Sequence, residues 1–413
     1  MSRRIRLPVS LVATLCIAGM ACSRANVPPK GFTTRDSAGV TIAENNGGAW
    51  APDSGWKIGP VDLALGGDTS PGPKLGDVGH VALMSDGRVV VTDAGNDAVI
   101  VYDPAARAGR TIAKEGHGPG EVFRVVDAWV GPADSIVAYD GGNARLEIFA
   151  PDGRFVRTML LATSGPDVGM TAVGRLPDGT FLGDHLHPPA KASVQARWDS
   201  ASYLRLGADS LNILDTLVVL PRFEQFMMHV TYLGRAMPPT PQPIVYGHMT
   251  DVLTTPGGFA VANNAHWQIQ EYDARGRLRR SIRRMVTPER VTSADIDAYR
   301  RVYDSALQNQ KGLPPELRAQ FASQVRGAPA SKTVPLFGRV LCGADGSYWV
   351  GRYDPLEQYT FESYSVIDST GRYLGEIAIP KGEHLVAVTG TEIYTVGTTP
   401  TGGPVLLRRP IVR

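Results

Sequence analysis

The feature that most constrains the fold of this chain is an internal repeat of about 45 residues. The turn sequence Asp93–Asn96 (DAGN) returns 47 residues later as Asp140–Asn143 (DGGN). Each repeat contains four short runs rich in β-branched residues, separated by turn sequences such as Asp-Gly and Gly-Asn. This pattern is typical of antiparallel strands joined by tight turns. Weaker copies of the repeat follow at 170–183, 249–284 and 338–379.

The last repeat, residues 385–413, has room for about three strands. The N-terminal segment offers two candidates for the missing strand, Gly39–Glu44 and Val61–Leu65. Six four-stranded units, one of them completed by strands from both termini, predict a six-bladed β-propeller whose closed ring hides the sheet edges. A tandem of β-sandwiches would not explain an incomplete last unit. We therefore expect one all-β propeller domain over residues 38–413.

The composition favours a globular protein with many turns. The 413 residues include 46 glycines and 31 prolines, and only 20% of the residues are charged. These proportions exclude disordered, coiled-coil and collagen-like chains. The formal net charge of +2 gives no electrostatic basis for nucleic-acid binding, so we predict no nucleic-acid partner.

Two segments interrupt the repeat. Residues 221–245 are rich in Met, Phe and Pro and lack alternation of period two, so we expect a long excursion over one face between the third and fourth blades. Residues 292–325 have the apolar spacing of two short helices, with Thr292 or Ser293 as the first cap. We expect this helical insertion to pack against the rim of the fourth or fifth blade. A lid or a docking surface is the alternative.

The first residues have the pattern of an export signal. A segment with three arginines precedes an apolar run over 7–18, which is shorter than the roughly 20 residues that cross a membrane. Gly19–Cys22 resembles a bacterial lipoprotein processing site, with Gly19 where Leu, Val or Ile is usual. We therefore predict a signal peptide over 1–21, lipidation of Cys22 and a polar tether over 22–37.

The predicted location is the cell envelope, where the N-terminal lipid anchor makes the membrane a partner. Ordinary cleavage nearby, which would release a soluble periplasmic or secreted protein, is the alternative. Removal of 1–21 takes away three arginines, so the mature chain has 39 basic and 40 acidic residues and a net charge of −1. With Cys22 lipidated, Cys342 has no partner for a disulfide.

Two motifs carry a resemblance to a known family. The segment Glu115–Val122 (EGHGPGEV) resembles the G-x-G-P-G-E-F signature of a bacterial secreted family of six-bladed propellers, with Val122 in place of the final Phe. The segment Arg35–Ile42 (RDSAGVTI) resembles the start of many members. That family is similar to the NHL-repeat propellers. The resemblance spans roughly residues 35–413 and implies the fold and export, but little about chemistry.

The glycine motif also has a physical interpretation. It comprises Gly116, Gly118, Pro119, Gly120 and Glu121. Pro119 fixes φ while the glycines permit positive φ, so the segment sustains neither helix nor strand. We expect a structural crossover between two blades, in which Glu121 accepts backbone hydrogen bonds. A ligand-binding role in the channel is the alternative.

A unique site should break the repeat, and several polar residues do. The candidate ligand-binding residues are His185, His187, Arg222, His229, Tyr232 and Arg235, beside the apolar Phe226, Met227 and Met228. Apolar, sulfur-containing and cationic groups together suit an anionic or amphiphilic ligand at the channel mouth. The alternative is that Phe226 and Met227 plug the channel.

A metal site is the second possibility. His185 and His187 alternate along a strand and so share one face, with Asp184 on the other. A metal needs three or four converging ligands, and this pair supplies two. We therefore predict no cofactor, with a divalent metal at His185 and His187 as the alternative. The repeated Asp93 and Asp140 are better explained by turn chemistry than by metal binding.

No catalytic motif is evident. The sequence contains no G-x-S-x-G elbow, and Cys342 lies in an apolar run that suits the core. The favoured function is an envelope-anchored or secreted binding or scaffold module for a protein, peptide or glycan on the face that carries 221–245. The alternative is a metal-dependent enzyme that resembles the lactonase or lyase propellers.

Overall fold

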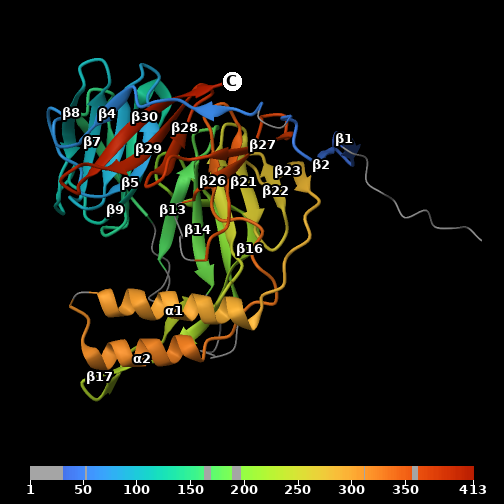
Figure 1. Ribbon diagram of the computed structural model, residues 1–413. Helices are drawn as coiled ribbons and strands as arrows, with labels where there is room; N and C mark the ends of the chain where they lie inside the picture. Colours follow the sequence, from blue (N-terminus) through green and yellow to red (C-terminus); the bar gives the residue numbers. More distant parts are fainter. Residues whose placement is uncertain (1–30, 52–53, 162–168, 188–196, 311, 356–360) are drawn as a thin grey trace, which may run out of the picture.

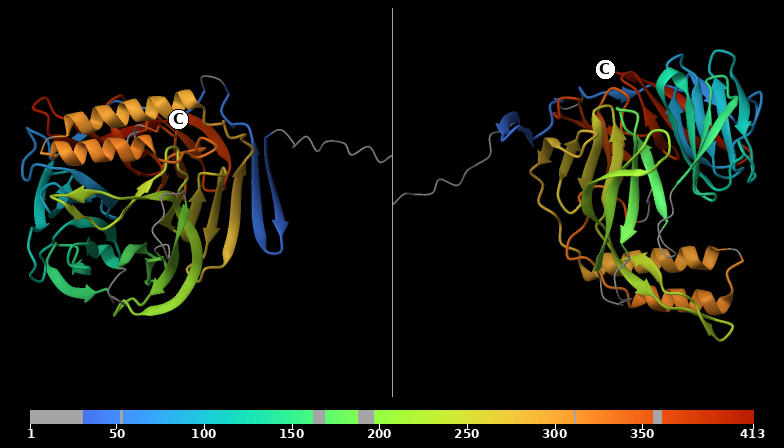
Figure 2. Two further views of the ribbon diagram at one scale, coloured as in Figure 1. Left: turned by 90° about the horizontal axis from the view of Figure 1, so that it is seen from below. Right: turned by 180° about the vertical axis from the view of Figure 1, so that it is seen from behind.

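The computed structural model describes residues 31–51, 54–161, 169–187, 197–310, 312–355 and 361–413. Within these ranges, six sheets of four or more strands form a ring around a central channel (Figures 1 and 2). The chain is therefore a six-bladed β-propeller, and the fold predicted from the repeat is confirmed. In the described part of the chain, no helix is long and apolar enough to cross a membrane.

Three blades have the simple four-stranded order of the repeat. The first blade contains β5 (Val78–Leu83), β6 (Val89–Asp93), β7 (Ala98–Asp103) and β8 (Ala108–Ala113). The second contains β9 (Val125–Val130), β10 (Ile136–Asp140), β11 (Arg145–Phe149) and β12 (Phe155–Leu160), with a 3-10 turn at Pro132–Asp134. The fifth contains β24 (Val340–Cys342), β25 (Tyr348–Gly351), β26 (Ser363–Ile367) and β27 (Tyr373–Ala378).

The sixth blade is completed by the N-terminal segment. It contains β28 (His384–Val388), β29 (Glu392–Thr398) and β30 (Pro404–Val412), joined by β3 (Lys57–Ile58) and β4 (Leu63–Leu65). Strand β4 pairs with β30 in antiparallel register, and Leu65 lies opposite Leu406. Leu63 and Leu65 are buried in the core cluster between the first and sixth blades. The Val61–Leu65 candidate is confirmed as a closing strand.

The Gly39–Glu44 candidate is placed elsewhere, in the fourth blade. That blade contains β20 (Thr250–Thr255), β21 (Gly258–Asn263), β22 (Gln268–Tyr272) and β23 (Leu278–Arg284), extended by β2 (Val40–Asn46) and β1 (Gly31–Ser37). Strand β2 lies parallel to β23 on the outer edge. The buried amide of Asn45 explains the choice, because it accepts from Tyr373 N at 2.8 Å and donates to Gly371 O at 3.0 Å in the fifth blade.

The third blade carries the excursion predicted at 221–245. It contains β13 (Met170–Arg175), β14 (Phe181–His187), β15 (Arg197–Leu206), β16 (Ile213–Met228) and β19 (Thr240–Pro243). The excursion is a ribbon rather than an irregular loop, because β16 continues beyond the blade and pairs with β19 between Gln225 and Met228. A hairpin of β17 (Thr231–Tyr232) and β18 (Arg235–Ala236) forms its tip.

The helical insertion is present as predicted. Helix α1 (Ser293–Asn309) begins with a capping box, in which Thr292 Oγ1 accepts from Asp295 N and the Asp295 carboxylate accepts from Thr292 N. Helix α2 (Pro315–Arg326) follows with proline at its first position. Both helices lie outside one face of the ring, beside the ribbon of the third blade (Figures 1 and 2).

Candidate functional site

The first strand of each blade is the innermost strand and lines the channel. Neighbouring inner strands contact one another around the ring, as β5 does with β9 and β28. Inside lies a cavity of about 470 Å³, lined by His80 of β5, Asp127 of β9, Leu253 of β20, Leu341 of β24 and Val386 of β28. The inner strands begin on the side where the helices lie, so this side carries the channel mouth beneath the insertion (Figure 2).

Two ion pairs place charge inside the channel. Arg339 Nη1 lies 3.2 Å from Asp251 Oδ1, and Val340 N donates to Asp251 Oδ2 at 3.0 Å. Burial raises the pKa of Asp251, against the opposing effect of Arg339. His80 Nδ1 lies 2.8 Å from Asp127 Oδ1. Burial by itself lowers the pKa of His80, but the neighbouring Asp127 carboxylate outweighs burial, and the net shift is upward.

A second cavity, of about 290 Å³, opens at the mouth under the insertion. Its walls include Tyr246, Tyr299 of α1 and Tyr353 of the fifth blade. The ring centroid of Tyr246 lies 6.3 Å from that of Tyr299 and 6.1 Å from that of Tyr353. Arg339 lines this cavity as well as the channel cavity. An aromatic wall with a few polar groups is the usual composition of a ligand site.

The insertion supplies this wall because its helices are amphipathic. Ile296 and Tyr299 of α1 and Phe321 of α2 pack against a buried cluster that contains Tyr246 and Phe226. Tyr299 of α1 therefore has two roles, because it packs against this cluster and also faces the cavity. The insertion therefore contacts the ribbon of the third blade as well as the fifth blade, which it meets through Tyr353.

Of the blade-three candidates, His185 and His187 lie together, whereas Arg222 contacts Asp184. The rings of His185 and His187 are 5.3 Å apart between centroids, so their predicted common face is confirmed. His187 Nε2 lies 2.6 Å from Ser202 Oγ on the next strand. Arg222 is 3.8 Å from the buried carboxylate of Asp184 and stacks over its neighbour Phe223.

The remaining candidates lie at the tip of the ribbon, where β17 contacts α2. Gln324 Nε2 donates to the carbonyl of His229 at 3.0 Å. Gln320 exchanges hydrogen bonds with the backbone of Thr231, which precedes Tyr232. Arg235 is exposed on β18. The six candidates therefore form two groups, His185, His187 and Arg222 on blade three and His229, Tyr232 and Arg235 beside α2.

Sequence reasoning missed the residues that line the mouth. Phe223 and Glu224 directly follow the candidate Arg222, and His248 is not among the candidate residues. Tyr246, Tyr353 and Arg339 are isolated in sequence and come together only in the ring. Only Tyr299 lies in a segment with a local signal, since the apolar face predicted for the helices of 292–325 must find an apolar or aromatic partner.

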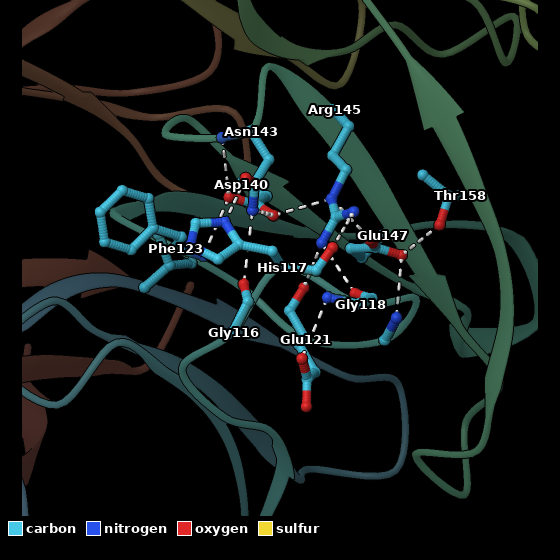
Figure 3. A network of polar contacts seen from close by, with 12 residues as sticks. Gly116, His117, Gly118, Glu121, Phe123, Asp140, Asn143, Arg145, Glu147 and Thr158 are labelled. Carbon is cyan, nitrogen blue, oxygen red and sulfur yellow. Dashed lines mark hydrogen bonds and ion pairs between the residues drawn. The ribbon is translucent and has the colours of Figure 1, made fainter.

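The glycine motif folds around one buried arginine of the next blade (Figure 3). Arg145 donates to the carbonyls of His117, Gly118 and Glu121 at 3.0, 2.8 and 3.0 Å. Gly118 N donates to Glu121 Oε2 at 3.0 Å, so Glu121 accepts a backbone hydrogen bond as predicted. The motif joins β8, the outer strand of one blade, to β9, the inner strand of the next.

Geometry requires one glycine of the motif and brings a second close to the Glu121 side chain. Gly120 has φ of +78°, where a side chain is strained. A Cβ on Gly116 would collide with the carboxylate of Glu121. His117 Nδ1 lies 2.8 Å from Asn143 Oδ1, which ties the crossover to the repeated turn.

The repeated aspartates act as predicted, in turns. Asp93 accepts from Gly95 N and Asn96 N at 3.2 Å each. It also accepts from Asp77 N at 2.9 Å, and Asp140 accepts from Phe123 N at 2.9 Å. Each aspartate thus holds its own turn and the segment that enters its blade.

The metal alternative was tested against the side chains. Among the described residues, no group of three or more His, Cys, Asp or Glu side chains is placed to hold a metal ion. His185 and His187 are close to each other, but a structural or catalytic metal site needs at least one further protein ligand. We derive no metal chemistry from this pair.

Comparison with known proteins shows the fold. No protein-family model and no curated protein sequence matches the chain. A member of the DUF4221 family from Bacteroides vulgatus is 9% identical with a TM-score of 0.51, over 86% of this chain and 98% of that one. A putative exported protein from Bacteroides fragilis is 12% identical with a TM-score of 0.49, over 87% and 95%.

A gluconolactonase from Xanthomonas campestris is 11% identical with a TM-score of 0.40, over 85% of this chain and 98% of that one. At these identities the similarity to the DUF4221 protein concerns fold alone, and the two lower scores support no argument. The motif-based resemblance to a secreted, NHL-like family stays a prediction.

Proposed function

We propose that this chain is an exported propeller that binds a ring-bearing group of a glycan or peptide ligand at its channel mouth. The observation that carries the proposal is the cavity framed by Tyr246, Tyr299 and Tyr353. Tyrosines offer large flat faces with a polar tip, which suits sugar rings and aromatic side chains. Arg339 and Glu224 line the same cavity and supply ionic contacts of both signs for the polar edge of a ligand.

The insertion supports this proposal because it contributes one wall of the cavity, and the blades contribute the others. Helix α1 contributes Tyr299 from above, while Phe223 and Phe361 belong to the blades. A bound group would therefore be held between the insertion and the ring. This geometry keeps the ligand on the face that carries 221–245, where the sequence predicts it.

The test is a binding screen with matched variants. Wild-type protein is applied to a glycan array and a peptide library, and every retained compound is titrated against Tyr299→Ala, Tyr299→Phe and Val302→Ala. Tyr299→Ala should weaken binding at least about tenfold, because a buried aromatic anchor is typically worth ~2 kcal/mol. Tyr299→Phe keeps the ring, and Val302 is exposed on the same helix, so both should bind like the wild type. Retention of no compound, or equal binding by Tyr299→Ala, contradicts the proposal.

Export and anchoring form the second part of the proposal. Residues 1–30, including Cys22, lie outside the described residues. The basic and apolar segments before Cys22 support a lipoprotein signal. Labelled palmitate should be incorporated by cells that express the wild type and not by cells that express Cys22→Ser. Equal incorporation rules out the anchor.

A further inference from the structure

A hydroxyl, an imidazole and a carboxylate are connected on the wall of a third cavity. Thr333 Oγ1 lies 3.2 Å from Nε2 of His248, and Nδ1 of His248 lies 2.7 Å from Oε2 of Glu224. The side chain of His248 is 6% exposed. Thr333 follows α2, His248 precedes β20 and Glu224 belongs to β16, so no local pattern connects the three groups.

The carboxylate decides which ring nitrogen carries the proton. Burial by itself raises the pKa of Glu224, but hydrogen bonds donated by the side chain and backbone of His248 outweigh burial and lower it. An ionised carboxylate only accepts hydrogen bonds, so Nδ1 of His248 is the protonated nitrogen. The other ring nitrogen, Nε2, faces the hydroxyl of Thr333 and is the one that can accept its proton. Ser331 Oγ, in contrast, is 3.1 Å from Nδ1, on the carboxylate side of the ring.

The cavity has the size and lining of a substrate site. It measures about 730 Å³ and lies between the third and fourth blades, with Thr333, His248 and Glu224 among its lining residues. Its apolar walls include Leu220 and Val261. Besides the three connected groups, its polar lining residues include Asn263, Gln268, Gln270 and Lys332, with Trp198 on the third blade. A small ester with an apolar acyl group and a polar alcohol would find partners for both parts.

We propose that Thr333, His248 and Glu224 form a metal-independent site for hydrolysis of small acyl esters. Thr333 is the nucleophile, His248 the general base and Glu224 the residue that positions the imidazole. The spacing meets the two requirements of an activated hydroxyl, since the base contacts the nucleophile and a third group orients the base. Glu224 and His248 also line the tyrosine cavity, so the two proposed sites share one wall, but Thr333 lines only this cavity and the three tyrosines only the other.

The proposed reaction consumes one water. Thr333 Oγ1 attacks the carbonyl carbon of the ester, and its proton moves to Nε2 of His248. The ester C–O bond then breaks, and the proton on Nε2 goes to the leaving alkoxide, which departs as the alcohol. Water attacks the acyl-threonine and gives a proton to Nε2. That proton returns to Thr333 Oγ1 as the carboxylic acid leaves.

A fluorophosphonate probe tests the nucleophile directly, because the activated oxygen displaces fluoride and keeps the phosphonyl group. Trypsin cleaves after Lys332, so Thr333 appears in the peptide 333–339 and Ser331 in the peptide 327–332. We expect the label on 333–339 in the wild type, in Thr333→Ser and in Ser331→Ala. We expect its loss in Thr333→Ala and in His248→Asn.

Activity and stability are measured beside labelling. Hydrolysis of p-nitrophenyl butyrate should fall on the order of a hundredfold or more in Glu224→Gln, because the ring loses its oriented tautomer. Thr333→Ala should lose the hydrolytic activity, and Thr333→Ser should keep it. Both variants should have melting temperatures near that of the wild type. Tyr299→Ala should keep the label, which separates this proposal from ligand binding. A wild-type protein without label on 333–339, or a label that persists on that peptide in Thr333→Ala, overturns the proposal.

Discussion

Replacement of Arg145 by methionine should destabilise the propeller more than any other single arginine change in the second blade. The side chain of Arg145 is 10% exposed, and its Nε lies 2.9 Å from Asp140 Oδ2 and 2.8 Å from Glu147 Oε1, both on fully buried side chains. It also holds three carbonyls of the glycine crossover. Methionine keeps an unbranched apolar stem and removes the charge, the donors and the volume of the guanidinium head.

The magnitude follows from the groups left behind. Removal of one partner of a buried ion pair costs about 3–5 kcal/mol, because the other charge stays buried without compensation. Arg145→Met leaves two carboxylates in that position, so we expect the loss to reach at least the upper part of this range. With a urea m-value of about 3 kcal/mol/M, the denaturation midpoint should fall by more than about 1 M.

The pH dependence gives the prediction a second arm. Burial raises the pKa of Glu147, against the lowering effects of Thr158 and Arg145. A carboxyl whose pKa is raised on folding favours the folded state at low pH, and this contribution is lost as the pH rises through the folded-state pKa. Without Arg145, one of the effects that lower the pKa of Glu147 is lost, so that pKa rises further. The deficit of Arg145→Met relative to the wild type should therefore be smaller near pH 5 than near pH 8.

The assay is urea denaturation followed by tryptophan fluorescence at both pH values. Arg154→Met is the matched control, because Arg154 is an exposed arginine of the same blade and should change stability by less than about 0.5 kcal/mol. If Arg145→Met is as stable as Arg154→Met, the guanidinium does not hold the crossover and the reasoning fails.

Three further predictions concern the crossover, the thiol and the channel. Gly116→Ala should displace the Glu121 carboxylate and remove its hydrogen bond from Gly118 N, so we expect a loss of about 1 kcal/mol in thermal melts, while Gly257→Ala, in open space, should change stability little. Burial raises the pKa of Cys342 to about 12. In a variant whose other cysteines are replaced by serine, this thiol should therefore not react with Ellman's reagent at pH 8 until guanidinium unfolds the chain. Prompt reaction of the folded protein contradicts this. Asp127→Asn should lower the pKa of His80 measured by NMR titration. The loss of stability should be largest below about pH 6.5, where the raised pKa of His80 stabilises the folded state. An unchanged titration of His80 contradicts the pairing with Asp127.

The repeat was sufficient to predict the blades because its signals are local. Asp93 and Asp140 accept hydrogen bonds from backbone N–H groups of their own turns. Such local contacts require the same residue types in each copy of the turn, so the repeat is visible in the sequence. The cap at Thr292 is equally local. The closing strand at 63–65 followed from counting strands, since one unit was incomplete.

The choice between the two N-terminal segments was beyond local reasoning. Both segments have strand character, and β2 joins the fourth blade because the Asn45 amide finds partners at Gly371 and Tyr373, more than 300 residues away. The support of the glycine crossover by Arg145 likewise spans 24 to 28 residues of sequence. Hydrogen-bond partners at such separations carry no periodic signal.

The sequence by itself determined the ring, its strand order and the turns, because alternation and turn chemistry act over a few residues and repeat six times. The tertiary structure alone decided the sites. Tyr246, Tyr299 and Tyr353 meet only after a helical insertion folds back over the ring, and Glu224, His248 and Thr333 meet where a ribbon, a blade entry and the return from that insertion cross. Each of these residues is unremarkable in its own segment, and their proximity is a consequence of closure of the propeller.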